Sequence, residues 1–399
     1  MDSWLVFSQD FMRIAIITSE IAPWATPLFE RLARRSDVEI LVVYETLLEP
    51  GRRWLNEADL PFAHELLESW TLDLSRLAIG SGFRTRGDTY LYVPKRPLAA
   101  IRRFRPDVVV AAGGGVWSSP ADIAALATRR RHGWAVVPWW GSFRRSQLTI
   151  PRRLAGPLVR AFVRSGDAWI SYGTLASADL VDLGADPKRI VIAPLVAREV
   201  PATIPGAGSP PSDIPVRRPS QLPRYLFVGR LIERKGLDVL LEAFRKVDAG
   251  ELWIVGDGPL EDFVKRAARD DDRIRLFGYS DGSDLGDLYR AADVLVVPSY
   301  YEVWGLVVNE AQAYGLPVIS TDQVGAAADL IEPGVNGLVV PPGSSRALAN
   351  AMTEFAHRTA EQAEMCVERC RVLIAERSLD DTAEAWVAAC AIGLEHRRG

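Results

Sequence analysis

Short apolar runs rich in β-branched residues recur along the first half of the chain, and each is followed by a stretch with helical periodicity. Continuous hydrophobicity over such runs is typical of strands buried on both faces, as in a parallel sheet covered by helices. The predicted strands are Arg13–Thr18, Val38–Tyr44, Asp107–Ala112, Trp134–Trp139, Asp167–Tyr172 and Ile190–Leu195. The pattern therefore predicts a doubly wound, Rossmann-like α/β domain over residues 1–200.

A proline-rich segment then interrupts the alternation. Residues 201–224 contain seven prolines with Gly and Ser between them, which is the composition of a linker. Strand and helix patterns resume over residues 225–378, which predicts a second Rossmann-like domain. Its predicted strands are Tyr225–Gly229, Glu251–Val255, Arg273–Phe277, Asp293–Pro298 and Pro317–Thr321. A last amphipathic helix is expected over residues 379–399, where it can pack back on the N-terminal domain.

Length and composition agree with this division. A chain of 399 residues is longer than one hydrophobic core usually grows, and its 48% apolar and 25% charged residues are typical of a globular protein. The fold class expected is therefore α/β, with two doubly wound domains facing across a cleft. Ligands of such folds bind at the carboxyl ends of the strands.

Cysteine usage indicates a reducing compartment. The three cysteines, Cys366, Cys370 and Cys390, lack the spacing of a disulfide framework. Charged residues interrupt the apolar stretch near the start of the chain, and no basic region or cleavage site accompanies it, so we expect neither a signal peptide nor a membrane span. These observations predict a cytoplasmic protein.

Charge is unevenly distributed, although the net charge is only −4. Residues 1–200 carry 26 Lys and Arg against 21 Asp and Glu, which leaves 21 against 30 for the rest. Between Lys95 and Arg164 there are 14 basic residues and two acids, a local excess that favours peripheral association with an anionic membrane at its inner face. The competing interpretation is a general arginine bias, 42 Arg against 5 Lys, that scatters cations over solvated faces. No nucleic-acid partner is expected.

Candidate chemistry is concentrated in the second half. Gly229 and Arg230 follow a predicted strand, and Lys235 precedes the next helix. Glycine lets a backbone approach a ligand closely, a helix N-terminus favours anions, and the two cations add positive charge. This predicts a pyrophosphate site, against the alternative of an ordinary surface loop with two cations.

Two further motifs follow strands of the same predicted sheet. Gly256 begins the turn GDGP, which indicates only a strand, a tight turn and a helix. In the segment PSYYEVWGLVVNE, Glu302 lies on a loop and Glu310 in the helix that follows, so both carboxylates can face one elongated ligand. Free amides at the start of that helix, at Gly305, Leu306 and Val307, can hold phosphate oxygens. The alternative is a helix with a stabilising acidic first turn.

Together these motifs resemble family 4 of the glycosyltransferases, the group 1 enzymes of GT-B fold, most specifically across residues 225–342. The resemblance implies that a sugar moves from a nucleoside diphosphate donor, with retention of anomeric configuration, to a glycan, lipid or small-molecule acceptor. It implies that residues 1–200 bind the acceptor and residues 225–378 the donor. Arg230 and Lys235 would then bind the diphosphate and help it depart, Glu302 would contact the transferred sugar, and Glu310 would hold the ribose hydroxyls. Neither a protein nucleophile nor a metal cofactor is implied.

The N-terminal half departs from the family pattern. Relatives commonly have a Gly-Gly loop after the first strand, where this chain has a bulkier run from Ile21 to Pro27, and a His where this chain has Trp140-Gly141. Acceptor handling therefore rests on other candidates: Trp24, Trp139, Trp140, Arg144 and Arg145. Aromatic residues at a strand end can stack on a sugar, but more often they pack in the core.

Other interpretations stay open at this point. Asp270-Asp271-Asp272 has the D-x-D spacing of a metal motif, but it precedes a strand, so we expect a solvated loop. A nucleotide-sugar epimerase would share the donor site and isomerise the donor without an acceptor, although it would need acid and base groups that the N-terminal half does not display. A non-catalytic sugar-nucleotide binder would bind without turnover.

Overall fold

A computed structural model describes residues 11–47, 60–73, 90–111, 119–142, 150–196, 222–280 and 282–399. The described chain divides into two compact units. The first comprises the described residues up to Pro194 together with Leu379–Gly399, and the second comprises Leu195–Ser378.

The first unit contains a seven-stranded sheet whose neighbouring strands all run parallel, in the order β3-β2-β1-β6-β7-β8-β9. Its strands are β1 (Met12–Thr18), β2 (Val38–Tyr44), β3 (His64–Leu66), β6 (Val108–Ala111), β7 (Ala135–Trp140), β8 (Trp169–Ser171) and β9 (Ile190–Ile192). Its helices are α1 (Thr26–Ala33), α2 (Ala99–Phe104), α3 (Pro120–His132), α4 (Ile150–Ser165), α5 (Thr174–Leu183) and α13 (Leu379–Arg398), with a 3₁₀ turn at Pro187–Arg189. An antiparallel pair, β4 (Ser69–Asp73) and β5 (Tyr90–Pro94), lies outside this sheet.

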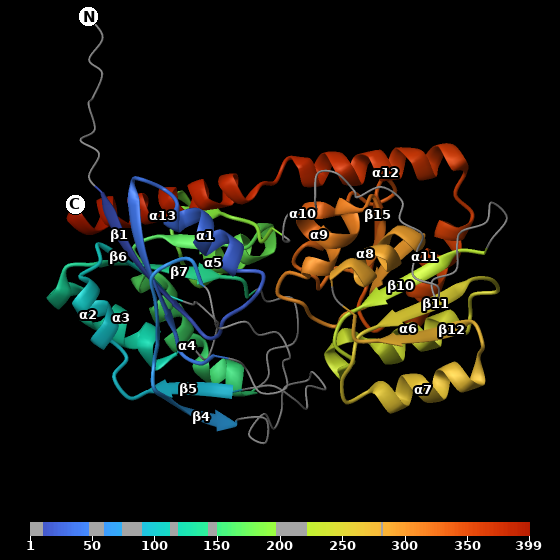
Figure 1. The fold of residues 1–399 in the computed structure, drawn as a ribbon, viewed down its shortest axis with the longest axis horizontal. Coiled ribbons are helices and arrows are strands. Elements are labelled where there is room, and N and C mark those ends of the chain that lie inside the picture. Colours follow the sequence, from blue (N-terminus) through green and yellow to red (C-terminus); the bar gives the residue numbers. More distant parts are fainter. Residues whose placement is uncertain are drawn as a thin grey trace, which may run out of the picture. The chain divides into compact units, whose positions relative to one another are not determined.

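Helix α13, the last segment of the chain, packs against α1 and the strands β7 to β9 of the first unit (Figure 1). Gly393 allows this close approach, because a Cβ atom there would lie 2.7 Å from the Val137 side chain. Trp386 is buried and meets the rings of Phe29 and Trp139 edge-on.

The second unit contains a six-stranded sheet, also parallel throughout, in the order β12-β11-β10-β13-β14-β15. Its strands are β10 (Arg224–Val228), β11 (Glu251–Val255), β12 (Ile274–Gly278), β13 (Val294–Val297), β14 (Val318–Thr321) and β15 (Gly337–Val340). Its helices are α6 (Leu237–Phe244), α7 (Glu261–Asp270), α8 (Gly282–Ala291), α9 (Leu306–Ala313), α10 (Ala327–Leu330), α11 (Ser345–Ala356) and α12 (Ala360–Ala375), with a 3₁₀ turn at Glu233–Lys235.

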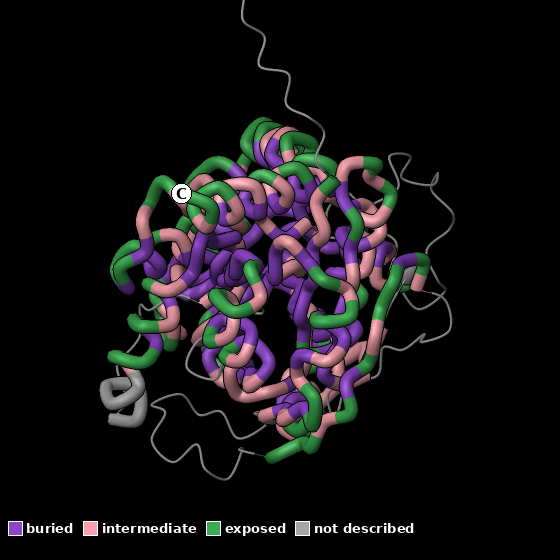
Figure 2. Tube along the Cα trace, turned by 90° about the vertical axis from the view of Figure 1, so that its left-hand side faces the viewer, coloured by how far each residue is buried: buried purple, intermediate pink, exposed green. Residues whose placement is uncertain are grey.

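Both units have the doubly wound topology, so the predicted fold class is confirmed. The inner strands β6 and β13 consist entirely of buried Val, Leu and Ala side chains, and β1 and β10 contain the buried runs Ile14–Ile17 and Tyr225–Phe227. Helices cover both faces of such sheets, and Figure 2 shows the buried stretches inside with exposed residues at the periphery. In each sheet the strand order reverses beside the first strand, which is where ligands of open α/β sheets bind.

The structure adds elements that the hydrophobic pattern does not predict. Strand β3 consists of His, Glu and Leu, none of which is buried, and β15 begins with a glycine and is followed directly by two prolines, so neither is an apolar run of the predicted kind. Strand β4 exposes most of its residues, among them Trp70, and therefore lacks the continuous hydrophobicity of a buried strand.

Candidate functional site

The loops that follow β10 and β13 lie against each other at the point where the strand order of the second sheet reverses. The backbone N–H of Tyr300 donates to the carbonyl of Arg234 at 2.9 Å. Gly236 is in the left-handed region with φ +71°, and a Cβ atom there would lie 2.1 Å from the carbonyl oxygen of Pro298. Only glycine fits this position, because a side chain would clash with the backbone of Pro298. The glycine of the Lys-Gly pair noted in the sequence therefore allows the two loops to lie in contact.

The loop after β11 completes this edge of the sheet. Gly256 has φ +135°, and a Cβ atom there would lie 1.9 Å from the carbonyl oxygen of Gly229. The N–H of Leu231 donates to the carbonyl of Asp257 at 2.7 Å. The loops at Gly229 and Gly256, which follow neighbouring strands, therefore pack against each other at one edge of the sheet. Their backbones are in direct contact.

Lys235 and Glu302 form an ion pair across these loops. The Lys235 Nζ donates to Glu302 Oε2 at 2.5 Å, and the two side chains are 13% and 15% exposed. Lys235 also lies over Gly229, because a Cβ atom at that glycine would be 3.5 Å from Lys235 Cε. A partly desolvated pair of this kind interacts more strongly than an exposed one, and removing one partner leaves the other uncompensated.

The backbone around Glu302 is held by the loop after β14. Its N–H donates to the carbonyl of Gln323 at 2.9 Å, and its carbonyl accepts from the N–H of Gly325 at 3.0 Å. Gly305 then forms the N-cap of α9 with φ +98°, and no side chain caps the helix. The first amides of a helix have no intrahelical acceptor, so Gly305, Leu306 and the residue after them present donors beside Glu302.

Glu310 lies in α9, as predicted, and accepts a hydrogen bond through Oε2 from the hydroxyl of Tyr289 at 2.7 Å. Burial raises the pKa of the Glu310 carboxyl, while the Tyr289 hydroxyl and the positive charge of Lys235 act to lower it. The site therefore combines Lys235, Glu302 and Glu310 within one electrostatic environment. Arg230 is half-buried in the same loop as Lys235.

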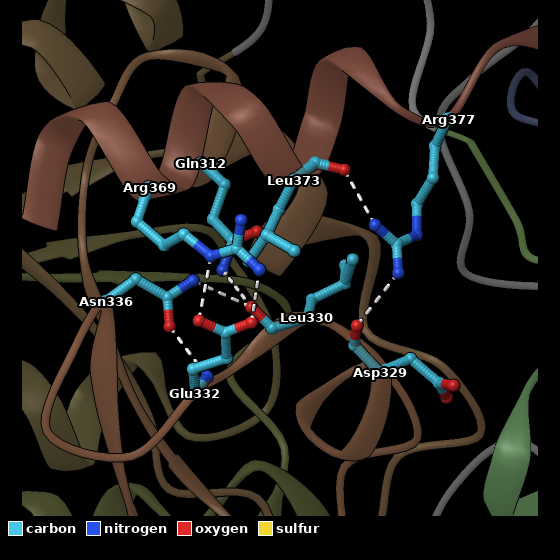
Figure 3. Close-up of polar contacts among 8 residues, drawn as sticks. All are labelled: Gln312, Asp329, Leu330, Glu332, Asn336, Arg369, Leu373 and Arg377. Carbon is cyan, nitrogen blue, oxygen red and sulfur yellow. Dashed lines mark hydrogen bonds and ion pairs between the residues drawn. The ribbon is translucent and has the colours of Figure 1, made fainter.

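The opposite side of α9 is fixed by a polar network (Figure 3). Gln312 Nε2 and Asn336 Nδ2 both donate to the carbonyl of Leu330, at 2.6 and 2.8 Å. Arg369 on α12 pairs with Glu332 through both guanidinium branches. The network joins α9, α12 and the segment before β15. It therefore holds in position the helix that carries Glu310.

The D-x-D segment has a structural arrangement. Asp271 accepts from Arg273 through both carboxylate oxygens, at 3.0 and 2.7 Å, and this contact holds the pKa of Asp271 below its usual range. Across the described ranges, no group of three or more His, Cys, Asp and Glu side chains is placed to hold a metal ion.

The aromatic acceptor candidates lie in the first unit. Trp139 and Trp140 are 4% and 1% exposed. Trp139 packs against Trp24, Tyr172 and Trp386, with ring centroids 5.5, 5.1 and 4.7 Å away. Rings enclosed in this way fit the packing alternative rather than a platform for a sugar. Trp24 is half-buried beside them.

The basic candidates Arg144 and Arg145 lie outside the described residues. Elsewhere in the stretch from Lys95 to Arg164, several cations have acidic partners from other parts of the chain. Lys95 pairs with Glu68, and Arg103 pairs with Glu65 at 2.5 Å. The excess counted along the sequence is therefore smaller in space. No helix in the described ranges is long and apolar enough to cross a membrane.

Two residues of chemical interest were not predicted from the sequence. In the sequence, Tyr289 looks like one more apolar position of a helix. Its hydrogen bond to Glu310 is seen only in the three-dimensional structure. Glu45 follows β2, is 4% exposed, and burial raises its pKa to about 7. A charged residue directly after a buried strand is the signal that could have identified Glu45.

Comparison with known proteins places this site in a family. The profile described as "Glycosyl transferases group 1" matches residues 222–358, which include all the predicted donor residues. The lipopolysaccharide core biosynthesis glycosyltransferase LpsE of Rhizobium meliloti is 26% identical over 347 residues, covering 86% of this chain and 88% of that protein. A GDP-mannose-dependent alpha-mannosyltransferase of Corynebacterium glutamicum is 32% identical over 171 residues, covering 43% of this chain and 38% of that protein.

Solved structures agree on the fold. Anabaena HepE, crystallised with UDP and glucose, superposes with a TM-score of 0.66 at 16% identity, covering 95% of this chain and 99% of that one. The sucrose-phosphate synthase of Thermosynechococcus elongatus gives a TM-score of 0.68 at 21% identity, covering 94% and 98%. With two Rossmann-like units of GT-B fold and a second unit whose residues 222–358 match the group 1 profile, the chain is a glycosyltransferase that is similar to the group 1 enzymes of the family 4 type.

Proposed function

We propose that the chain transfers a sugar from a nucleoside diphosphate donor to a hydroxyl of a glycan, lipid or small-molecule acceptor, with retention of anomeric configuration. The observation that carries this proposal is the Lys235–Glu302 ion pair beside Glu310, at the reversal point of the second sheet. Structural relatives such as HepE were crystallised with UDP, which supports a nucleotide donor here.

The chemistry of the residues suits such a donor. An ammonium group has three N–H donors, so Lys235 can keep Glu302 and still bind a phosphate oxygen. Arg230 and the first amides of α9 add further donors for the leaving diphosphate. In this proposal Glu302, held by Lys235, accepts from hydroxyls of the transferred sugar, and Glu310 accepts from the ribose diol. The leaving phosphate can take the proton of the acceptor hydroxyl, so no protein nucleophile is required.

A thermal-shift screen tests the donor. We expect UDP, GDP or ADP to raise the melting temperature, because a ligand at one hundred times its dissociation constant stabilises a protein by about 2.7 kcal/mol. The matching nucleoside monophosphate should stabilise less, since it lacks the phosphate nearest Lys235. If no diphosphate shifts the melting temperature at millimolar concentration, the proposed donor site is wrong.

Retention of configuration is a separate expectation. Proton magnetic resonance of the product, recorded early in the reaction, should show the same anomeric configuration as the donor sugar. An inverted anomeric signal would contradict the retaining mechanism while leaving nucleotide binding intact.

We also propose that the first unit associates peripherally with an anionic membrane. Strand β4 supports this, since Trp70 is 60% exposed on it and an exposed tryptophan ring is suited to a membrane interface. Basic residues near an anionic surface contribute about 1 kcal/mol each. Arg144 and Arg145 are the cations that we expect to add to this contact.

Liposome sedimentation tests this association. The protein should bind vesicles with anionic lipid at low salt, release them at high salt, and ignore neutral vesicles. Arg144→Ser/Arg145→Ser should weaken binding by roughly 10- to 30-fold if both arginines contribute. Absence of binding to anionic vesicles at low salt would contradict the proposed membrane association.

A further inference from the structure

Tyr289 faces the candidate donor site from a helix that no predicted motif includes. It lies on α8 and is 2% exposed, and its hydroxyl donates to Glu310 Oε2 at 2.7 Å. Buried polar groups are normally hydrogen-bonded, so the tyrosine and the carboxylate satisfy each other.

Packing fixes the ring of Tyr289. It stacks on Tyr314 with a centroid distance of 5.5 Å and an angle of 11° between the planes. The guanidinium of Arg290 lies 5.3 Å from the centroid of the Tyr314 ring. Gly286, one turn earlier on α8, leaves room for this arrangement, because a Cβ atom there would lie 2.6 Å from the Tyr314 hydroxyl.

A fixed donor restricts the carboxylate that it holds. A free glutamate side chain on a helix samples several rotamers and loses that freedom when a ligand binds. Here the bond from Tyr289 selects one orientation beforehand, and the network behind α9 keeps the helix in place (Figure 3). Groups held in their bound geometry before binding give higher affinity and sharper specificity.

We infer that Tyr289 is a positioning residue that presents the Glu310 carboxylate to the ribose diol of the nucleotide and so sets the preference for ribose over deoxyribose. This inference rests on the proposed function, because it assumes that a nucleotide binds at Glu310. Tyr289 need not touch the nucleotide, since its effect passes through one hydrogen bond.

The test measures nucleotide affinity by calorimetry with UDP, GDP or ADP, whichever binds the wild-type protein, and with its 2′-deoxy and 3′-deoxy counterparts. Tyr289→Phe removes the hydroxyl and keeps the ring stack. We expect it to weaken the ribonucleotide about tenfold and to lower the ribose-to-deoxyribose affinity ratio toward that of Glu310→Gln. A Tyr289→Phe/Glu310→Gln double variant should lose little more than Glu310→Gln alone.

Tyr225→Phe is the matched control. Tyr225 is also buried in the second unit, and its hydroxyl donates to the carbonyl of Met352 at 2.9 Å. This variant should leave the affinity ratio unchanged even if it melts at a lower temperature. The inference is overturned if Tyr289→Phe lowers the melting temperature but keeps the wild-type ratio, or if its effect adds fully to that of Glu310→Gln. If no nucleotide binds the wild-type protein, the proposed function fails first, and the inference fails with it.

Discussion

Replacing Lys235 with alanine is expected to weaken binding of a nucleoside diphosphate by roughly 10- to 150-fold, because a hydrogen bond to a charged group contributes about 1.5–3 kcal/mol. The change removes the ammonium that bonds Glu302 at 2.5 Å, so the Glu302 carboxylate, which is 15% exposed, loses this ion pair. Turnover should fall at least as far as affinity, since the same charge would stabilise the departing diphosphate. Calorimetry with the diphosphate and initial rates with the sugar donor measure the two effects.

Two further variants separate phosphate binding from the loss of the ion pair. Lys235→Ala/Glu302→Ala removes both charges of the ion pair, so affinity should stay low if Lys235 binds phosphate and recover if its only role is to neutralise Glu302. Lys246→Ala is the matched control, because Lys246 pairs with Glu242 on the exposed face of α6. A Lys235→Ala protein that binds and turns over like Lys246→Ala would exclude Lys235 from the donor site.

The alternation of buried strands and helices was predictable because it depends on a short-range property of the chain. Strands such as β1 and β10 contain short continuous apolar runs, Ile14–Ile17 and Tyr225–Val228, whereas a helix shows a period of 3.6 residues over a longer stretch. Strand and helix can therefore be distinguished without any knowledge of contacts. Strand β3, with the sequence His-Glu-Leu, has no apolar run, and the run in β15 lies between a glycine and two prolines. Strand β4 was not predicted because its side chains are exposed and mixed in polarity.

The grouping of the candidate donor residues followed from topology as well. Residues directly after parallel strands meet at one edge of the sheet, so the glycines and charges after β10, β11 and β13 had to lie near one another. Topology did not predict which side chains within that edge bond to one another. Whether Lys235 bonds Glu302 or Glu310, and whether Tyr289 reaches either, depends on side-chain rotamers and on the placement of α8, which no local pattern encodes.

Residues of the first unit show a different limit. A pattern identified Trp139 as the end of a strand, but its surroundings come from Trp24, Tyr172 and Trp386, which are remote in sequence. Charge counted along residues 95–164 likewise ignored Glu65 and Glu68, which partner two of the cations. Long-range pairing decides whether an aromatic ring or a cation is available to a ligand.

Gly256→Ala is expected to disrupt the candidate donor site more than the same substitution at any other glycine of the site. Gly256 combines φ +135° with a position where the new Cβ atom would lie 1.9 Å from the carbonyl oxygen of Gly229. Backbone in such a region costs about 1–3 kcal/mol for a residue with a side chain. The contact adds to this, because the rigid backbone of the neighbouring loop must move, and Lys235 rests on that loop. Nucleotide binding should therefore fall below detection, with a melting temperature several degrees lower.

Gly334→Ala is the control that adds a methyl group at a positive φ without a steric contact. Gly334 also has a positive φ, +84°, but a Cβ atom there meets no atom within 4 Å. This variant should lose only the roughly 1–2 kcal/mol of a left-handed residue and bind nucleotide as the wild-type protein does. Urea unfolding compares the stabilities, and calorimetry compares the affinities. Equal destabilisation of the two variants, or wild-type nucleotide affinity in Gly256→Ala, would show that the close approach of the loops after β10 and β11 is not what shapes the donor site.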